Sequence, residues 1–355
     1  MTIRQLLSAA VLCGALATSA SAGEVRFTGQ GHAYNPAWSP NGRYLAFEVN
    51  NYDDKTDLHV SVLNGAIAED ARKVSLPGAT GPFGSSQVVV NPVWHPTNNI
   101  VFEGSNAGGQ YRLYFYQPTG AAAYELIPAT AVKGDLTFPA FDAKGNLMAF
   151  VADETGAGDI RIRDNNSSSI TTVMSSSSAE MFPQFNENAS KILFTRKHNN
   201  SEDVFEVDVA TGQESPVVGG SQDQTRPTYA AGGRILFFDN SRDNSQWDLA
   251  SVTGPGGTKK VMAKSVRLPH RARPALTPDG QWVAVTFEDP AKANSVVLMK
   301  VDGSKTVTIP TSYSACGEPS IGVQDGKVLL AYTALPTGAA DYRKLYVVDI
   351  TDKLQ

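Results

Sequence analysis

Three arginines and one histidine lie within seven positions of an acidic chain, at Arg267, His270, Arg271 and Arg273. The sequence has 355 residues and a formal net charge of −5 at pH 7, so this segment concentrates positive charge against the overall trend. Arginine and aromatic side chains carry much of the binding energy at protein interfaces. The segment therefore indicates a docking patch for an acidic peptide, and a solvated loop is the alternative interpretation.

A second set of candidate residues stands directly before seven regularly spaced prolines. In chain order they are Asn35, Asn91, Phe138, Phe182, Arg226, Arg273 and Glu318. If successive repeats are neighbours around one axis, Phe138 and Phe182 form an aromatic arc beside a cationic one. The predicted partner-binding site at the mouth of a central channel consists of Phe138, Phe182, Arg226, His270, Arg271, Arg273 and Glu318.

Catalytic and metal-binding patterns are weak in this sequence. No serine lies in a G-x-S-x-G elbow, and no region the size of an α/β-hydrolase domain follows the repeats. The five histidines show no short metal-ligand spacing: His32, His59, His95, His198 and His270. A metal site in the channel with ligands from several repeats could nevertheless scatter its histidines in this way. The oxygen-rich stretches 50–57 and 239–244 do not match a calcium loop and read as polar turns. We expect no catalytic residue, no metal site and no cofactor.

Repeats of about 45 residues must position all of these side chains. The seven prolines, from Pro36 to Pro319, are separated by 56, 47, 44, 44, 47 and 45 residues. Each repeat predicts four strands, with the first strand beginning at the proline, an apolar second strand and glycine-containing turns. This period is typical of a β-propeller blade. The sequence therefore predicts an all-β, seven-bladed propeller, with six blades as the alternative.

The two ends of the chain are expected to meet in one blade. The seventh repeat ends after its third strand, at residues 345–350, and residues 24–27 have no other repeat to join. An N-terminal strand that completes the last blade would remove an exposed sheet edge. The large residue two positions after each proline, such as Trp38 or Trp94, is expected to fill the gap between blades.

Residues 1–22 predict a signal peptide, and residues 23–355 predict a single propeller domain. Arg4 precedes an apolar run at residues 6–17 that is too short to span a bilayer, and Ala20-Ser21-Ala22 has the small residues of a cleavage site. We therefore expect a periplasmic or secreted protein with no membrane span after cleavage. Cys316 would then have no disulfide partner, and the net negative charge argues against nucleic-acid binding.

Three segments resemble the WD40-like (PD40) β-propeller repeat of the TolB-like family, at residues 36–47, 273–285 and 345–350. The resemblance covers nearly all of the chain after the predicted signal peptide. It departs from TolB in two ways, because TolB has an α/β domain before its propeller and has six blades. The resemblance implies a ring that binds an envelope protein through one face. Similar repeats occur in oligogalacturonate lyases and in prolyl-oligopeptidase-like enzymes.

The sequence therefore predicts a non-enzymatic TolB-like scaffold, periplasmic or secreted, that binds a protein or a peptide. The expected partner is an envelope protein or an acidic peptide, with a lipoprotein among the candidates, and the expected state is a monomer. The alternative is a carbohydrate-active lyase or hydrolase with its site in the propeller channel. Three or more His or acidic ligands that face the channel at metal-binding distances would favour the enzyme, whereas a wide aromatic and basic mouth without such ligands would favour binding.

Overall fold

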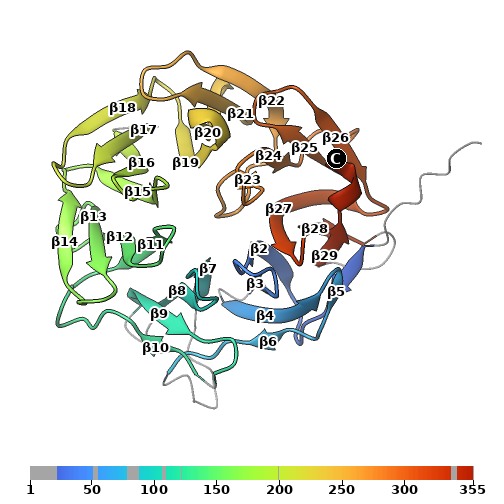
Figure 1. The fold of residues 1–355 in the computed structure, drawn as a ribbon, viewed down its shortest axis with the longest axis horizontal. Helices are drawn as coiled ribbons and strands as arrows, with labels where there is room; N and C mark the ends of the chain where they lie inside the picture. The colour runs from blue at the N-terminus through green and yellow to red at the C-terminus, as the bar shows by residue number, and fades with distance from the viewer. Residues whose placement is uncertain are drawn as a thin grey trace, which may run out of the picture.

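Each sequence repeat folds into one antiparallel β-sheet, and seven sheets stand in a ring around a central channel (Figure 1). The computed structural model describes residues 22–50, 55–77, 88–105, 109–120, 122–198, 200–336 and 342–354. Nearly all of the predicted signal peptide lies outside these residues. No helix in the described ranges is long and apolar enough to cross a membrane.

The blades are numbered here in chain order, and the strands of each are given from the channel outward. Blade 1 contains β2 (His32–Trp38), β3 (Tyr44–Asn50) and β4 (Thr56–Asn64), with β5 (Ile67–Ala68) and β6 (Arg72–Lys73) both paired to β4. Blade 2 contains β7 (Val89–Trp94), β8 (Ile100–Ser105), β9 (Tyr111–Tyr116) and β10 (Tyr124–Glu125). Blade 3 contains β11 (Leu136–Phe141), β12 (Leu147–Ala152), β13 (Asp159–Asp164) and β14 (Ile170–Met174).

The remaining four blades follow the same plan. Blade 4 contains β15 (Ala179–Phe185), β16 (Lys191–His198), β17 (Ser201–Asp208) and β18 (Glu214–Val218). Blade 5 contains β19 (Gln224–Ala230), β20 (Arg234–Asp243), β21 (Gln246–Thr253) and β22 (Lys260–Val266). Blade 6 contains β23 (Ala275–Leu276), β24 (Trp282–Val285), β25 (Ser295–Lys300) and β26 (Thr306–Pro310). Blade 7 contains β27 (Ser314–Gln324), β28 (Lys327–Leu335), β29 (Lys344–Asp349) and β1 (Gly23–Val25).

Both ends of the chain meet in blade 7, as the sequence predicted. Strand β1 pairs antiparallel with β29, so that Gly23 lies opposite Val347 and Val25 lies opposite Leu345. Val25 is fully buried. The last blade therefore has an N-terminal outer strand, and the prediction of seven blades is confirmed.

Apolar second strands supply the core between the blades. In blades 1 to 5 one phenylalanine of this strand is completely buried, and these residues are Phe47, Phe102, Phe150, Phe194 and Phe237. Burying a side chain of this size contributes about 2–3 kcal/mol relative to leaving it exposed. Two of the large residues that follow the prolines contact the neighbouring blade, as expected. The indole Nε1 of Trp94 donates to the carbonyl of Ala37 at 2.9 Å, and the indole Nε1 of Trp38 donates to the carbonyl of Ser320 at 3.2 Å.

Gly322 in β27 leaves the space that the Trp38 indole occupies. A Cβ atom at position 322 would lie 2.4 Å from Cδ2 of Trp38. We therefore expect Gly322→Ala to lower the free energy of unfolding by about 1–3 kcal/mol, since an overpacked core must shift. Urea unfolding followed by tryptophan fluorescence measures this change. Gly220→Ala is the matched control, because the nearest atom to its Cβ is 3.9 Å away; equal stability of both variants would contradict the packing argument.

Candidate binding site in the central channel

In six of the seven blades, the residue before the proline lies at a β-bulge in the strand that faces the channel. Six of the seven have a left-handed backbone with φ between 45° and 55°, and they are Asn35, Asn91, Phe138, Phe182, Arg226 and Glu318. The register of each of these inner strands shifts at this point. Proline has no N–H to donate and is accepted in edge strands and at bulges.

The expectation that each first strand begins at its proline is therefore wrong for six blades. Strand β2, for example, begins at His32, four residues before Pro36. Only the inner strand of blade 6 follows the prediction, because β23 begins directly after Pro274. As a result the residues before the prolines lie partway along the channel wall.

Side chains of neighbouring blades accept the N–H groups at these bulges. The N–H of Asn91 donates to Glu48 Oε1 at 2.7 Å, and the N–H of Phe138 donates to Glu103 Oε1 at 2.6 Å. The N–H of Asn35 donates to Glu318 Oε2 at 3.3 Å. Each of these bonds joins two adjacent blades and holds a left-handed residue that would otherwise be costly.

Glu48 and Glu103 are buried residues beside the channel that the sequence analysis did not select. They are 1% and 2% exposed, and Glu318 is 5% exposed. Burial raises the pKa of Glu103 and of Glu318 to about 7, against the lowering effect of the N–H groups that each accepts. Burial likewise raises the pKa of Glu48, which Arg271 opposes. Glu48 and Glu103 could have been found from the sequence, because each is the one acidic residue in a mostly apolar second strand.

The arginine-rich segment between blades 5 and 6 reaches several blades around the channel. We call residues 267–274 the channel segment. It leads into β23 at the inner edge of blade 6 (Figure 1). The N–H of His270 donates to Glu318 Oε1 of blade 7 at 2.7 Å, and Arg273 Nη2 donates to the carbonyl of Pro183 in blade 4 at 2.6 Å. Arg271 Nε lies 3.8 Å from Glu48 Oε2 of blade 1.

The structure brings together all seven residues that the sequence analysis selected. The rings of Phe138 and Phe182 lie 4.5 Å apart, and the Arg226 guanidinium lies 5.4 Å above the Phe182 ring. The same guanidinium donates to the carbonyls of Pro269, His270 and Ala272. Arg226 therefore binds the channel segment, and its donors are used inside the protein.

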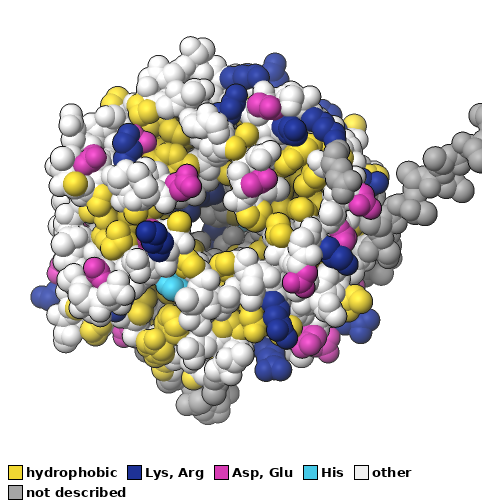
Figure 2. Space-filling view, viewed as in Figure 1, with side chains coloured by type: hydrophobic (Ala, Val, Ile, Leu, Met, Phe, Trp, Pro, Cys, Tyr) yellow, Lys and Arg dark blue, Asp and Glu magenta, His cyan; other side chains and the backbone are white. Residues whose placement is uncertain are grey.

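A cavity of 580 Å³ opens at the centre of the ring. Figure 2 shows this opening with hydrophobic side chains gathered around its rim. Asn35, Asn91, Phe138, Phe182, Arg271 and Arg273 are among the residues that line it. Arg226, His270 and Glu318 do not line the cavity. Arg226 and Glu318 instead hold the channel segment, to which His270 belongs, by hydrogen bonds to its backbone.

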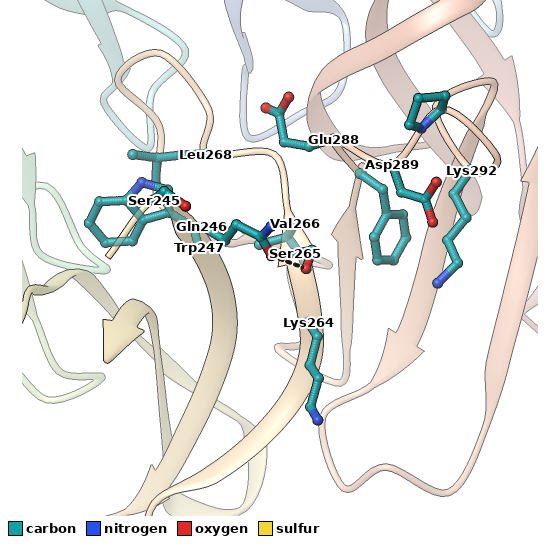
Figure 3. Close-up of a pocket in the computed structure, with 12 residues that line it drawn as sticks. Ser245, Gln246, Trp247, Lys264, Ser265, Val266, Leu268, Glu288, Asp289 and Lys292 are labelled. Atoms are coloured by element: carbon teal, nitrogen blue, oxygen red, sulfur yellow. Dashed lines mark hydrogen bonds between the residues drawn. The ribbon is translucent and has the colours of Figure 1, made fainter. Parts of the chain in front are cut away.

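A second cavity of 840 Å³ lies between blades 5 and 6 (Figure 3). Trp247 and Leu268 lie on its blade 5 side, and Asp289 and Lys292 lie on its blade 6 side (Figure 3). Its lining contains two lysines and two carboxylates: Lys264, Lys292, Glu288 and Asp289. The numbers of positive and negative side chains in this cavity are therefore equal.

Within the described parts of the chain, no group of three or more His, Cys, Asp and Glu side chains could hold a metal ion. His59 is buried against Phe47, and burial lowers its pKa to about 4. His95 Nε2 lies 3.0 Å from the carbonyl oxygen of Gly145. Cys316 is fully buried, and burial raises the pKa of its thiol. The arrangement in the channel can recognise charge and apolar surface.

Comparisons with known proteins agree with this architecture. The family model for the TolB beta propeller domain matches residues 84–325. The comparison with curated proteins finds no match. TolB from Acinetobacter baumannii is similar with a TM-score of 0.56 and 16% identity, over 79% of this chain and 67% of that one.

Two enzyme structures are also similar. An oligogalacturonate lyase in complex with manganese has a TM-score of 0.61 at 10% identity, over 90% of this chain and 89% of that one. A puromycin-hydrolyzing peptidase from Mycobacterium tuberculosis has a TM-score of 0.66 at 12% identity, over 91% of this chain and 51% of that one. Such low identities show a shared fold alone. Since the family match spans more than half of the sequence, the chain belongs to the TolB β-propeller family.

Proposed function

We propose that this protein is a non-enzymatic binding protein of the periplasm or the extracellular space, whose channel receives an acidic segment of an envelope protein. One observation carries the proposal: Arg271 and Arg273 line a cavity together with Phe138 and Phe182. Arginine and aromatic side chains that meet in a central, desolvated pocket are typical of binding hot spots. A carboxylate in such a pocket interacts more strongly with a guanidinium than it would in water.

Membership of the TolB family supports a protein partner, and we propose an envelope protein, with a lipoprotein as one candidate. We also propose that the protein acts as a monomer and that residues 1–22 direct its export. The enzyme alternative rests on likeness to structures that share the fold at 10% and 12% identity. No specific observation in the channel favours that alternative.

The test begins with the chain from Gly23 to Gln355 as bait in an envelope extract. The recovered partner is purified, and its binding is followed by surface plasmon resonance. We expect Phe182→Ala to raise the dissociation rate about 30-fold, which corresponds to a hot-spot loss of about 2 kcal/mol. Added salt should mainly slow association, because the partner is acidic.

Phe115→Ala is the matched control, because Phe115 lies on the third strand of blade 2 and packs against Tyr124, away from the channel. Both variants must show the circular dichroism spectrum of the folded protein. If Phe182→Ala and Phe115→Ala have the same dissociation rate, the partner binds elsewhere and the proposed function of the channel is wrong.

A further inference from the structure

The Arg273 side chain is half-buried in the wall of the channel cavity and has no ion-pair partner among the described residues. Its Nη2 donates to the Pro183 carbonyl at 2.6 Å, whereas its Nε is buried and has no hydrogen-bond partner among the described residues. None of the described carboxylates forms an ion pair with it, and the charge that acts on it most is the like charge of Arg226. Burial, followed by Arg226, lowers the pKa of Arg273 to about 10, so the side chain is still charged at neutral pH. Buried charges are ordinarily paired, because an unpaired one is costly.

The positive charges of the other two arginines, Arg226 and Arg271, are offset by carboxylates or carbonyl oxygens nearby. Arg271 forms a long ion pair with Glu48, at 3.8 Å. Arg226 donates to three carbonyls of the channel segment and is attracted by Glu318 and Glu202. Arg273 is therefore the only one of these three arginines without a carboxylate partner among the described residues, so an added carboxylate could pair with it.

We propose that Arg273 anchors one carboxylate group in the channel, carried by a molecule with an apolar or aromatic body. This proposal rests on the proposed function, because it specifies what the same site recognises. The cavity of 580 Å³ is within the usual size of a small-molecule site, and Trp94, Phe138 and Phe182 line it together with several of the repeat prolines. The apolar wall would cover the body of the ligand while the guanidinium binds its carboxylate. The chemistry is shared by a small aromatic acid and by the free C-terminus of a peptide that ends in a hydrophobic residue.

The experiment compares two probes that differ in charge alone, 3-phenylpropionate and 3-phenylpropanamide. Binding to the chain from Gly23 to Gln355 is measured by isothermal titration calorimetry and by the shift of the melting temperature. We expect the acid to bind and to raise the melting temperature, with the amide at least tenfold weaker. Arg273→Met should abolish the preference for the acid, and Arg273→Lys should retain part of it. Arg72→Met, at an exposed position of β6, is the matched control and should behave as wild type.

The stability of the ligand-free variant gives an independent readout. Removing an uncompensated charge should leave the melting temperature of Arg273→Met equal to or above that of wild type, whereas a purely structural arginine would lower it. Equal binding of acid and amide, or an undiminished preference for the acid in Arg273→Met, would overturn the proposal.

The source of the carboxylate is resolved with a six-residue peptide ending in Phe, used with a free or an amidated C-terminus. Tighter binding of the free peptide than of 3-phenylpropionate assigns the site to a chain terminus. Binding of the small acid without binding of the peptide assigns it to a small molecule, so that the carboxylate site stands while the proposed protein partner fails. If Phe182→Ala loses partner binding while the acid and the amide bind equally, the proposed protein partner stands and the carboxylate site fails.

Discussion

Deletion of residues 23–29 is expected to lower the free energy of unfolding by about 3–5 kcal/mol. Three backbone pairs between β1 and β29 are lost, and the fully buried Val25 leaves a cluster that contains Leu45, Leu329 and Val347. Removing a buried aliphatic residue of this kind costs about 2–4 kcal/mol by itself, and an unpaired sheet edge adds to the loss. Urea unfolding of the chains that begin at Gly23 and at Gln30 measures the difference.

Two point variants separate the strand from its side chain. Val25→Ala should cost about 2 kcal/mol, less than the deletion, because the backbone pairs remain. Ile67→Ala is the matched control, since Ile67 is 76% exposed and its loss should change stability by less than 0.5 kcal/mol. A midpoint for the truncated chain equal to that of the full chain would mean that β1 does not close the ring.

The ring was predictable because its causes are periodic. Seven prolines at similar intervals and a large residue two positions after each proline indicate one repeated blade. The closure followed from a missing strand at one end and a spare strand at the other, and β1 pairs where that argument placed it. Patterns of this kind depend on alternation along a strand, which the sequence displays directly.

The bulges could not be predicted from local preferences. A residue before proline is biased toward extended conformations, yet Phe182 and Arg226 have φ of 53° and 55°. The conformation of Arg226 depends on a residue of the preceding blade, because its N–H donates to Thr195 Oγ1 at 3.1 Å. Contacts between blades therefore override the local preference, and a single sequence does not show which side chain makes them.

The contents of the channel were only partly predictable. The aromatic and cationic residues were recognised by type, and the channel segment was recognised as arginine-rich. The sequence did not show that the Arg226 guanidinium would donate to backbone carbonyls of the channel segment. It also did not show that Arg273 would donate to the carbonyl of Pro183 in blade 4. An irregular connection has no periodic pattern, so its path is set by the partners that it finds across the channel.

Glu103 is expected to make the stability of the protein depend on pH. Its pKa is raised from 4.5 to about 7 in the folded protein by burial, so the folded state binds a proton more tightly than the unfolded state does. Stability from this group is fully present below about pH 4.5 and is lost as the pH rises to about 7. At about 1.4 kcal/mol per pKa unit, the loss is about 3 kcal/mol. Glu318 acts in the same direction, and its pKa is also raised to about 7.

His59 opposes this effect, so the pH profile of the wild type alone is not decisive. Burial lowers the pKa of His59 from 6.5 to about 4, and stability from this group rises between those values as the pH rises. The informative quantity is therefore the difference between a variant and the wild type at each pH. Glu103→Gln is suitable because an amide oxygen can still accept the N–H of Phe138 and the side-chain amide of Asn91.

We expect Glu103→Gln to gain about 2–3 kcal/mol of stability relative to wild type between pH 5 and pH 8, because the variant has no proton to lose. Urea unfolding at half-unit pH intervals measures this difference, and most of the change should fall below pH 7. Glu187→Gln at an exposed position is the control and should show a constant difference from wild type. A constant difference for Glu103→Gln as well would show that Glu103 is ionised throughout this range. The charge of Arg271 and the donors of Asn91 and Phe138 would then have to stabilise a full negative charge on Glu103.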